Sequence, residues 1–193
     1  ENINYSEGRP ALHVALRSKL SDQIALHIPG VKDIWATLDR MDQFVSRIHS
    51  RDLLGYTGKG LTNIVNVGIG GSDLGVMMSV EALKHHAKIG INFYNVSNID
   101  GIKLSDLMDE INIEETLFVI VSKTFTTKET LNNSNIAKQW VLDTLGLDAV
   151  TSHFAAVSAN GEAMNAFGIN SDYQFPIWDW VGGRYAITSA ANL

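Results

Sequence analysis

The sequence predicts a three-layer α/β domain with a parallel sheet, preceded by N-terminal helices. Short β-rich runs alternate with helical stretches along residues 59–193, as in βαβ units. The run at 117–121 is apolar on consecutive positions, which is typical of a central parallel strand buried on both faces. Polar turns follow the strands, where open parallel sheets bind their ligands.

The composition is that of a globular chain with one main domain. Of 193 residues, 45% are hydrophobic and 19% are charged. The net charge of −6 argues against general binding to nucleic acids or to membrane surfaces, which need clustered positive charge. The absence of cysteine excludes disulfides and thiol catalysis, and it is compatible with the cytoplasm. No apolar run has the length of a membrane span, and both ends look cut, so we expect a fragment.

The first third reads as helical. Leu12, Leu16 and Leu20 recur every four residues, and a second apolar stripe with a helical period runs over 31–48. This pattern ends at a turn cluster over 55–58. We therefore expect a helical segment over residues 1–58 and an α/β domain over residues 59–193.

The remaining elements alternate. After the first strand, the helix carries Leu74, Met77 and Met78. The expected strands are 64–67, 91–96, 117–121 and about 154–157, and a long helix is expected over about 127–145.

A glycine-dense turn, Gly-Ile-Gly-Gly-Ser-Asp-Leu-Gly, occupies 68–75 between a strand and a helix. Glycine lets the backbone approach a ligand closely, and free amides at a helix start favour an anion or a hydroxyl group. Asp73 stands where a dinucleotide fingerprint needs glycine, and the lysine of a P-loop is missing. A tight turn capped by Ser72 or Asp73 explains the segment equally well.

The segment Ser-Lys-Thr-Phe-Thr-Thr-Lys-Glu-Thr, residues 122–130, follows the central strand. Its hydroxyls and lysines crowd a strand-to-helix junction, where a phosphate meets donors on several sides and a favourable helix dipole. Thr126 and Glu129 have the spacing of a capping box that starts the helix. The alternative is a threonine-rich cap on an ordinary helix. Phosphate binding is favoured, because threonines gain little from clustering in a helix.

The segment Trp-Asp-Trp-Val-Gly-Gly-Arg-Tyr, residues 178–185, places an arginine after paired glycines. Arg184 offers a permanent charge and a rigid fork of donors, which suits stabilisation of an oxyanion. A structural pair between Arg184 and Asp179 is an equally good interpretation. We expect Trp178 and Trp180 to be core residues. The six histidines show no metal-binding spacing, so we expect no metal site.

Together these three segments resemble the phosphoglucose isomerase family, and the resemblance covers the whole chain in collinear order. Residues 95–101, Asn-Val-Ser-Asn-Ile-Asp-Gly, match as well. Val76 in place of an expected proline and the sequence of 186–188 are small departures. The resemblance implies two sugar isomerase (SIS) domains, each with a five-stranded parallel sheet, of which this chain is the first. It also implies interconversion of glucose 6-phosphate and fructose 6-phosphate without a metal or organic cofactor, by a cytoplasmic homodimer.

The resemblance also assigns roles to individual residues. Gly71 and Ser72 would contact the sugar phosphate. Arg184, with Gly183 beside it, would be catalytic by facing the sugar carbons and stabilising an enediolate. The phosphoryl group would be held in the loop of residues Ser122, Lys123, Thr124 and Thr127, which Phe125 and Thr126 shape. In the family the glutamate base, a histidine for ring opening and a late lysine lie outside the matched part.

Two other classes of protein compete with this interpretation. A sugar-phosphate-sensing SIS module that controls transcription would carry a basic DNA-binding helix, and the N-terminal region offers no basic stripe. A nucleotide-dependent Rossmann enzyme is opposed by Asp73. Neither alternative explains the arginine segment.

Overall fold

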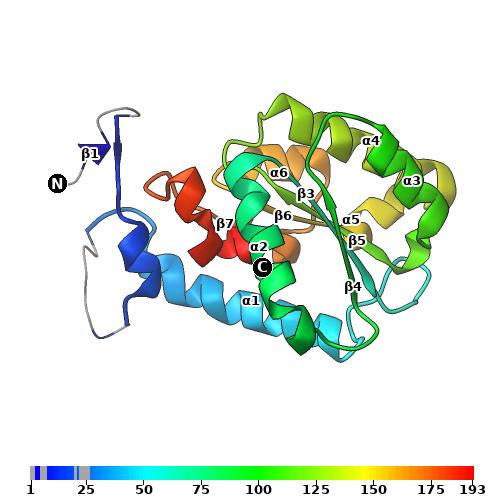
Figure 1. Cartoon of the computed structure of the whole chain (residues 1–193), viewed down its shortest axis with the longest axis horizontal. Helices are drawn as coiled ribbons and strands as arrows, with labels where there is room; N and C mark the ends of the chain where they lie inside the picture. Colours follow the sequence, from blue (N-terminus) through cyan, green and yellow to red (C-terminus); the bar gives the residue numbers. More distant parts are fainter. Residues whose placement is uncertain (1–2, 5–7, 20, 22–26) are drawn as a thin grey trace.

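The computed structural model describes residues 3–4, 8–19, 21 and 27–193. Its centre is a five-stranded sheet in the order β4–β3–β5–β6–β7, with every neighbouring pair parallel (Figure 1). The strands are β3 (Asn63–Gly68), β4 (Asn92–Val96), β5 (Thr116–Val121), β6 (Phe154–Ser158) and β7 (Gln174–Pro176). The parallel α/β architecture and the four expected strands are confirmed, and β7 is a fifth strand that the sequence pattern did not predict.

Helices cover both faces of this sheet. The α-helices are α1 (Ile34–His49), α2 (Leu74–Leu83), α3 (Ile102–Glu110), α4 (Lys128–Leu145), α5 (Val150–His153) and α6 (Gly161–Phe167). Figure 1 shows α3, α4 and α5 grouped on one side, and α1 running along the other. The 3₁₀ turns η9 (Gly183–Thr188) and η10 (Ala190–Asn192) lie next to α2. The result is a three-layer sandwich.

Shorter elements complete the chain. Strands β1 (Ile3–Asn4) and β2 (Arg9–Pro10) have two residues each and pair with each other in antiparallel fashion. The remaining 3₁₀ turns among the described residues are η1 (His13–Arg17), η3 (Val31–Asp33), η4 (Gly70–Ser72), η5 (Lys84–His86), η6 (Ile113–Glu115), η7 (Leu147–Ala149) and η8 (Ser171–Tyr173).

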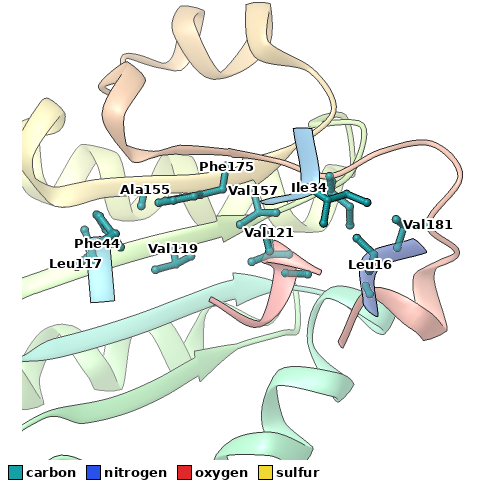
Figure 2. Packing of buried hydrophobic residues seen from close by; sticks show 14 of the residues in the cluster. Leu16, Ile34, Phe44, Leu117, Val119, Val121, Ala155, Val157, Phe175 and Val181 are labelled. Atoms are coloured by element: carbon teal, nitrogen blue, oxygen red, sulfur yellow. The ribbon is translucent and has the colours of Figure 1, made fainter. Parts of the chain in front are cut away.

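Strand β5 divides the core into two layers. Leu117, Val119 and Val121 point to the face covered by α1 and the C-terminal segment (Figure 2). Phe118 and Ile120 point to the opposite face, where they join residues of α3, α4 and α6. All six residues of β5 are buried, so its continuous apolar run reflects burial on both faces, as predicted.

The N-terminal region is less regular than its leucine spacing suggests. The stripe over 31–48 does form α1, whose Ile34, Phe44 and Ile48 are buried against the sheet. The expected α-helix through Leu12 and Leu16 is wrong: the structure has only η1, and Leu20 lies outside the described residues. The reason is tertiary, because the Leu12 amide donates to the carbonyl of Trp180 at 3.1 Å and fixes this segment to the C-terminal region. The domain boundary after residue 58 stays a prediction.

His153 forms hydrogen bonds to two segments at the end of the sheet where the strands begin. Its Nδ1 donates to the Thr116 carbonyl at 2.7 Å, and its Nε2 accepts the Tyr56 amide proton at 3.0 Å. These two bonds require the neutral imidazole, since the protonated ring has no acceptor. Burial lowers the pKa of His153 from its ordinary 6.5, against smaller opposing effects of Thr116 and Glu114. This histidine is structural, as expected, and lies at the end of the sheet away from the polar turns.

Candidate active site

The polar turns gather where the winding of the sheet reverses. From β3 the chain passes through α2 outward to the edge strand β4, and from β5 it passes through α4 in the opposite direction to β6. The last residues of the two strands, Gly68 and Val121, are register partners. Their following turns therefore start side by side at a topological switch point, which is the usual ligand crevice of an open α/β sheet.

The turn after β5 leads into the N-terminus of α4. Thr127 is the N-cap residue by backbone position, but no side chain caps the helix amides. The buried Ser122 hydroxyl instead donates to Thr127 Oγ1 at 3.3 Å. Two hydroxyls thus lie together beside open helix amides and the positive end of the helix dipole, which is an arrangement suited to a phosphate.

The predicted capping box is wrong. The Thr126 hydroxyl donates to Thr124 Oγ1 at 2.7 Å, and α4 begins one residue later than a cap at Thr126 requires. The cause is Phe125, whose backbone is left-handed (φ 54°) and whose side chain is buried against Phe167. A bulky residue in this conformation costs about 1–3 kcal/mol, which burial of the ring offsets. Phe125 is thus anchored by its buried ring, while Thr124 and Thr126 are exposed at the tip of the loop.

Residues at the end of β6 and just after it hold this loop from the other side, and none of the three predicted segments includes them. The Ser158 hydroxyl and the Ala159 amide both donate to the Lys123 carbonyl, at 3.0 and 2.8 Å. Asn160 Nδ2 donates to the Thr124 carbonyl at 3.2 Å. The available signal was a strand end followed by Asn-Gly at a helix start, since Asn160 also caps α6.

The turn after β3 folds tightly onto its own strand. A Cβ on Gly68 would lie 2.5 Å from the Ser72 carbonyl oxygen, so only glycine fits there. Asp73 is the N-cap residue of α2 by position, yet its carboxylate does not cap the helix and instead accepts a hydrogen bond from Asn95 Nδ2. The sequence analysis offered Ser72 or Asp73 as the cap of this helix, and the Asp73 carboxylate does not cap it.

The arginine segment packs directly on this turn. A Cβ on Gly71 would lie 2.2 Å from the Gly183 carbonyl oxygen, so the two backbones are in direct contact. Arg184 is exposed and lines a cavity of about 460 Å³. The other lining residues are Gly70, Gly71, Leu74, Gly75, Met78, Gly183 and Ile187. The structure thus brings Gly71 and Arg184 to one cavity.

Lys123 connects the phosphate loop to the arginine segment. Its ammonium donates to the Val181 carbonyl at 3.2 Å, three residues before Arg184. The contact between Gly71 and Gly183 joins the glycine turn to the arginine segment, and Lys123 joins the phosphate loop to that same segment. All three predicted segments are therefore connected. The role of Arg184 stays a prediction, with the structural pair to Asp179 still open as the alternative.

The arginine turn is also supported from the N-terminal side. The rings of His13 and Tyr185 stack at 3.7 Å with an interplanar angle of 5°. Trp180 is buried, stacks on Trp178 and donates from Nε1 to the Pro29 carbonyl at 3.0 Å. The two tryptophans are therefore packing residues, as expected.

Neither a metal cluster nor a membrane span emerges from the part of the chain that the structure describes. No group of three or more histidine, aspartate or glutamate side chains there is arranged to hold a metal ion. No helix in that part combines the length and the apolar character needed to cross a bilayer.

A five-stranded parallel sheet with helices on both faces, whose polar turns meet at a topological switch point, places the chain in the open α/β class of domains. The family model described as phosphoglucose isomerase matches residues 1–193, and the chain belongs to this family.

Relatives and solved structures agree with this assignment. The chain is 49% identical to a glucose-6-phosphate isomerase of Mycolicibacterium gilvum and 48% identical to one of Deinococcus radiodurans. The matches cover all of this chain but 35% and 36% of those relatives, so it spans about a third of their length. A crystal structure of a glucose-6-phosphate isomerase from Chlamydia trachomatis superposes with a TM-score of 0.78 at 28% identity, over 96% of this chain and 34% of that one.

Proposed function

We propose that this chain is the phosphate-holding part of an enzyme that interconverts glucose 6-phosphate and fructose 6-phosphate. The observation that carries the proposal is the contact between three turns at the switch point: the α4 N-terminus, the Gly71 turn and the Arg184 turn. The names of the relatives and of the superposed structure support the same reaction.

Each turn has a distinct task in this proposal. The hydroxyls of Ser122 and Thr127 and the first amides of α4 bind the phosphoryl group, with the exposed Thr124 at the rim. The Gly71 amide and Ser72 contact the sugar phosphate from the neighbouring strand. Anchoring the phosphate positions C1 and C2 of the sugar, because binding energy remote from the reacting atoms orients those atoms.

Arg184 acts on the reaction itself. Removal of a proton from C2 of the open-chain aldose leaves negative charge on the C1 oxygen. A proton then passes from the C2 hydroxyl to the C1 oxygen, and return of the first proton to C1 gives the ketose. The guanidinium of Arg184, which follows Gly183, stabilises this enediolate more than the neutral substrate. The base that carries the proton is assigned to the part of the family's length outside this chain, as the family resemblance implies.

The proposal extends to the cellular setting. The full-length enzyme, meaning the isomerase that contains this chain, is proposed to be a homodimer, as the family resemblance implies. It is proposed to work in the cytoplasm, because a dianionic sugar phosphate made there does not cross a membrane unaided.

Calorimetry on the 193-residue chain tests the phosphate site. We expect glucose 6-phosphate to bind and glucose to show no binding at the same concentration. Ser122→Ala and Thr127→Val should each weaken binding by about tenfold, the loss of one charge-assisted hydrogen bond. The matched control is Thr151→Val, since this hydroxyl of α5 donates to the Asp148 carbonyl in η7, ahead of β6. Equal binding by all variants would refute the proposed site.

A further inference from the structure

We infer that Asn95 is a positioning residue, which sets the Gly71–Ser72 turn through a buried chain of hydrogen bonds; the inference rests on the function proposed above. The chain consists of Asn66 on β3, Asn95 on β4 and Asp73 at the start of α2, here called the amide network. All three side chains are buried, at 2%, 6% and 7% exposure. Asparagine is disfavoured in strands. Two asparagines paired on neighbouring strands beside a turn therefore indicate a role other than forming the sheet.

The order of donors in the amide network is fixed by chemistry. Asp73 Oδ1 accepts a hydrogen bond from Asn95, which must therefore turn its Nδ2 toward the carboxyl group. Asn95 Oδ1 then faces Asn66 and accepts from Asn66 Nδ2 at 2.8 Å. The same Asn66 Nδ2 makes a longer bond of 3.4 Å to the Ser72 carbonyl. One carboxylate therefore determines the orientation of both amide groups.

The two ends of the amide network form hydrogen bonds to consecutive residues of the turn. Asn66 binds the carbonyl of Ser72, and Asn95 binds the carboxylate of Asp73. These residues follow directly on Gly71, whose backbone touches Gly183. A change in the amide network would therefore displace the Gly71 and Ser72 groups that contact the sugar phosphate. Through the contact with Gly183, it would also displace the backbone that carries Arg184. None of the three side chains needs to touch substrate for this effect.

The same two strands carry a matched control. Asn92 Nδ2 donates to Asn63 Oδ1 at 3.0 Å, and this pair stands three residues earlier on both strands. It joins the same two strands at their opposite ends, away from the turn, with the amide donor on β4 instead of β3 and with Asn92 exposed. Removing Asn92 or Asn95 thus deletes a cross-strand amide bond, but only Asn95 also reaches Asp73.

The test compares Asn95→Ala with Asn92→Ala in the 193-residue chain. For Asn95→Ala we expect about tenfold weaker binding of glucose 6-phosphate and faster hydrogen exchange of the Ser72 and Asp73 amides. For Asn92→Ala we expect binding within twofold of the unmodified chain, with those amides unchanged. Two further variants leave the strands intact: Asp73→Ala should reproduce the Asn95→Ala effect, and Asp73→Asn, which keeps an acceptor oxygen, should restore most of the affinity.

The outcomes separate this inference from the proposed function. Unchanged affinity and unchanged Ser72 exchange in both Asn95→Ala and Asp73→Ala would overturn the positioning role. If the unmodified chain binds no sugar phosphate, the proposed function fails, and amide exchange alone decides whether the network holds the turn. If Asn95→Ala does not fold, the Asp73 pair of variants carries the decision.

Discussion

Replacement of Gly71 by alanine tests the contact that joins two of the three turns. The new Cβ would lie 2.2 Å from the Gly183 oxygen and 2.4 Å from its carbonyl carbon. Ordinary contact begins at 3.4 Å, so the turns must separate by about 1.2 Å. Because both partners are backbone, no side chain can rotate away, and we expect a loss of about 1–3 kcal/mol in the free energy of unfolding. In the full-length enzyme, a displacement of about 1 Å should lower kcat/KM by about 10²-fold.

Urea unfolding of the 193-residue chain gives the stability change, with two glycine controls. Gly183→Ala approaches the same contact from the other side, where a Cβ meets nothing within 4 Å. Gly101→Ala also meets nothing within 4 Å, at a φ of −66° that alanine adopts freely. Both should stay within about 0.5 kcal/mol of the unmodified chain. If Gly71→Ala is as stable as these controls, the close approach of the two turns is refuted.

Three further predictions concern catalysis and pH. In the full-length enzyme, Arg184→Ala should lower kcat by about 10²-fold or more with a smaller change in KM, as steady-state kinetics would show; near-normal kcat would contradict enediolate stabilisation. The 193-residue chain alone should show no isomerase turnover in a coupled assay while still binding glucose 6-phosphate, since a missing general base costs about 10²–10⁴ in rate. Turnover that disappears in an Arg184→Ala preparation would place the base within this chain. Because the pKa of His153 is lowered on folding, the unfolded state binds the proton more readily, so stability should fall as pH drops through and below 6.5. Urea unfolding between pH 7.5 and 5 should show a shallower fall for His153→Gln, and an identical fall would refute this assignment.

The fold could be predicted from local patterns because burial leaves them in the sequence. The consecutive apolar residues 117–121 identified the central strand, and the period of 31–48 identified α1. Strand β7 escaped prediction because it has three residues and ends in Pro176, which gives no alternation to detect. The helix expected through Leu12 failed because a tertiary bond to the Trp180 carbonyl overrides the spacing.

The site could be predicted by segment but not by contact. Glycines and hydroxyls after strands indicated turns that the structure does bring into contact, and their role in binding stays a prediction. The capping box at Thr126 failed because the left-handed Phe125 shifts the helix start by one residue. The bond from Lys123 to Val181 joins residues 58 positions apart, and no local pattern reports it.

The most direct test of the account is a crystal structure of the 193-residue chain with glucose 6-phosphate. We expect the phosphoryl group within hydrogen-bond distance of the Ser122 and Thr127 hydroxyls and the first amides of α4, with the sugar carbons directed toward Arg184. A different cavity of about 700 Å³, lined in part by Trp178 and Trp180, lies beyond β6 and offers a competing location. A phosphate bound there, with the α4 N-terminus unoccupied, would contradict phosphate binding by the loop after β5.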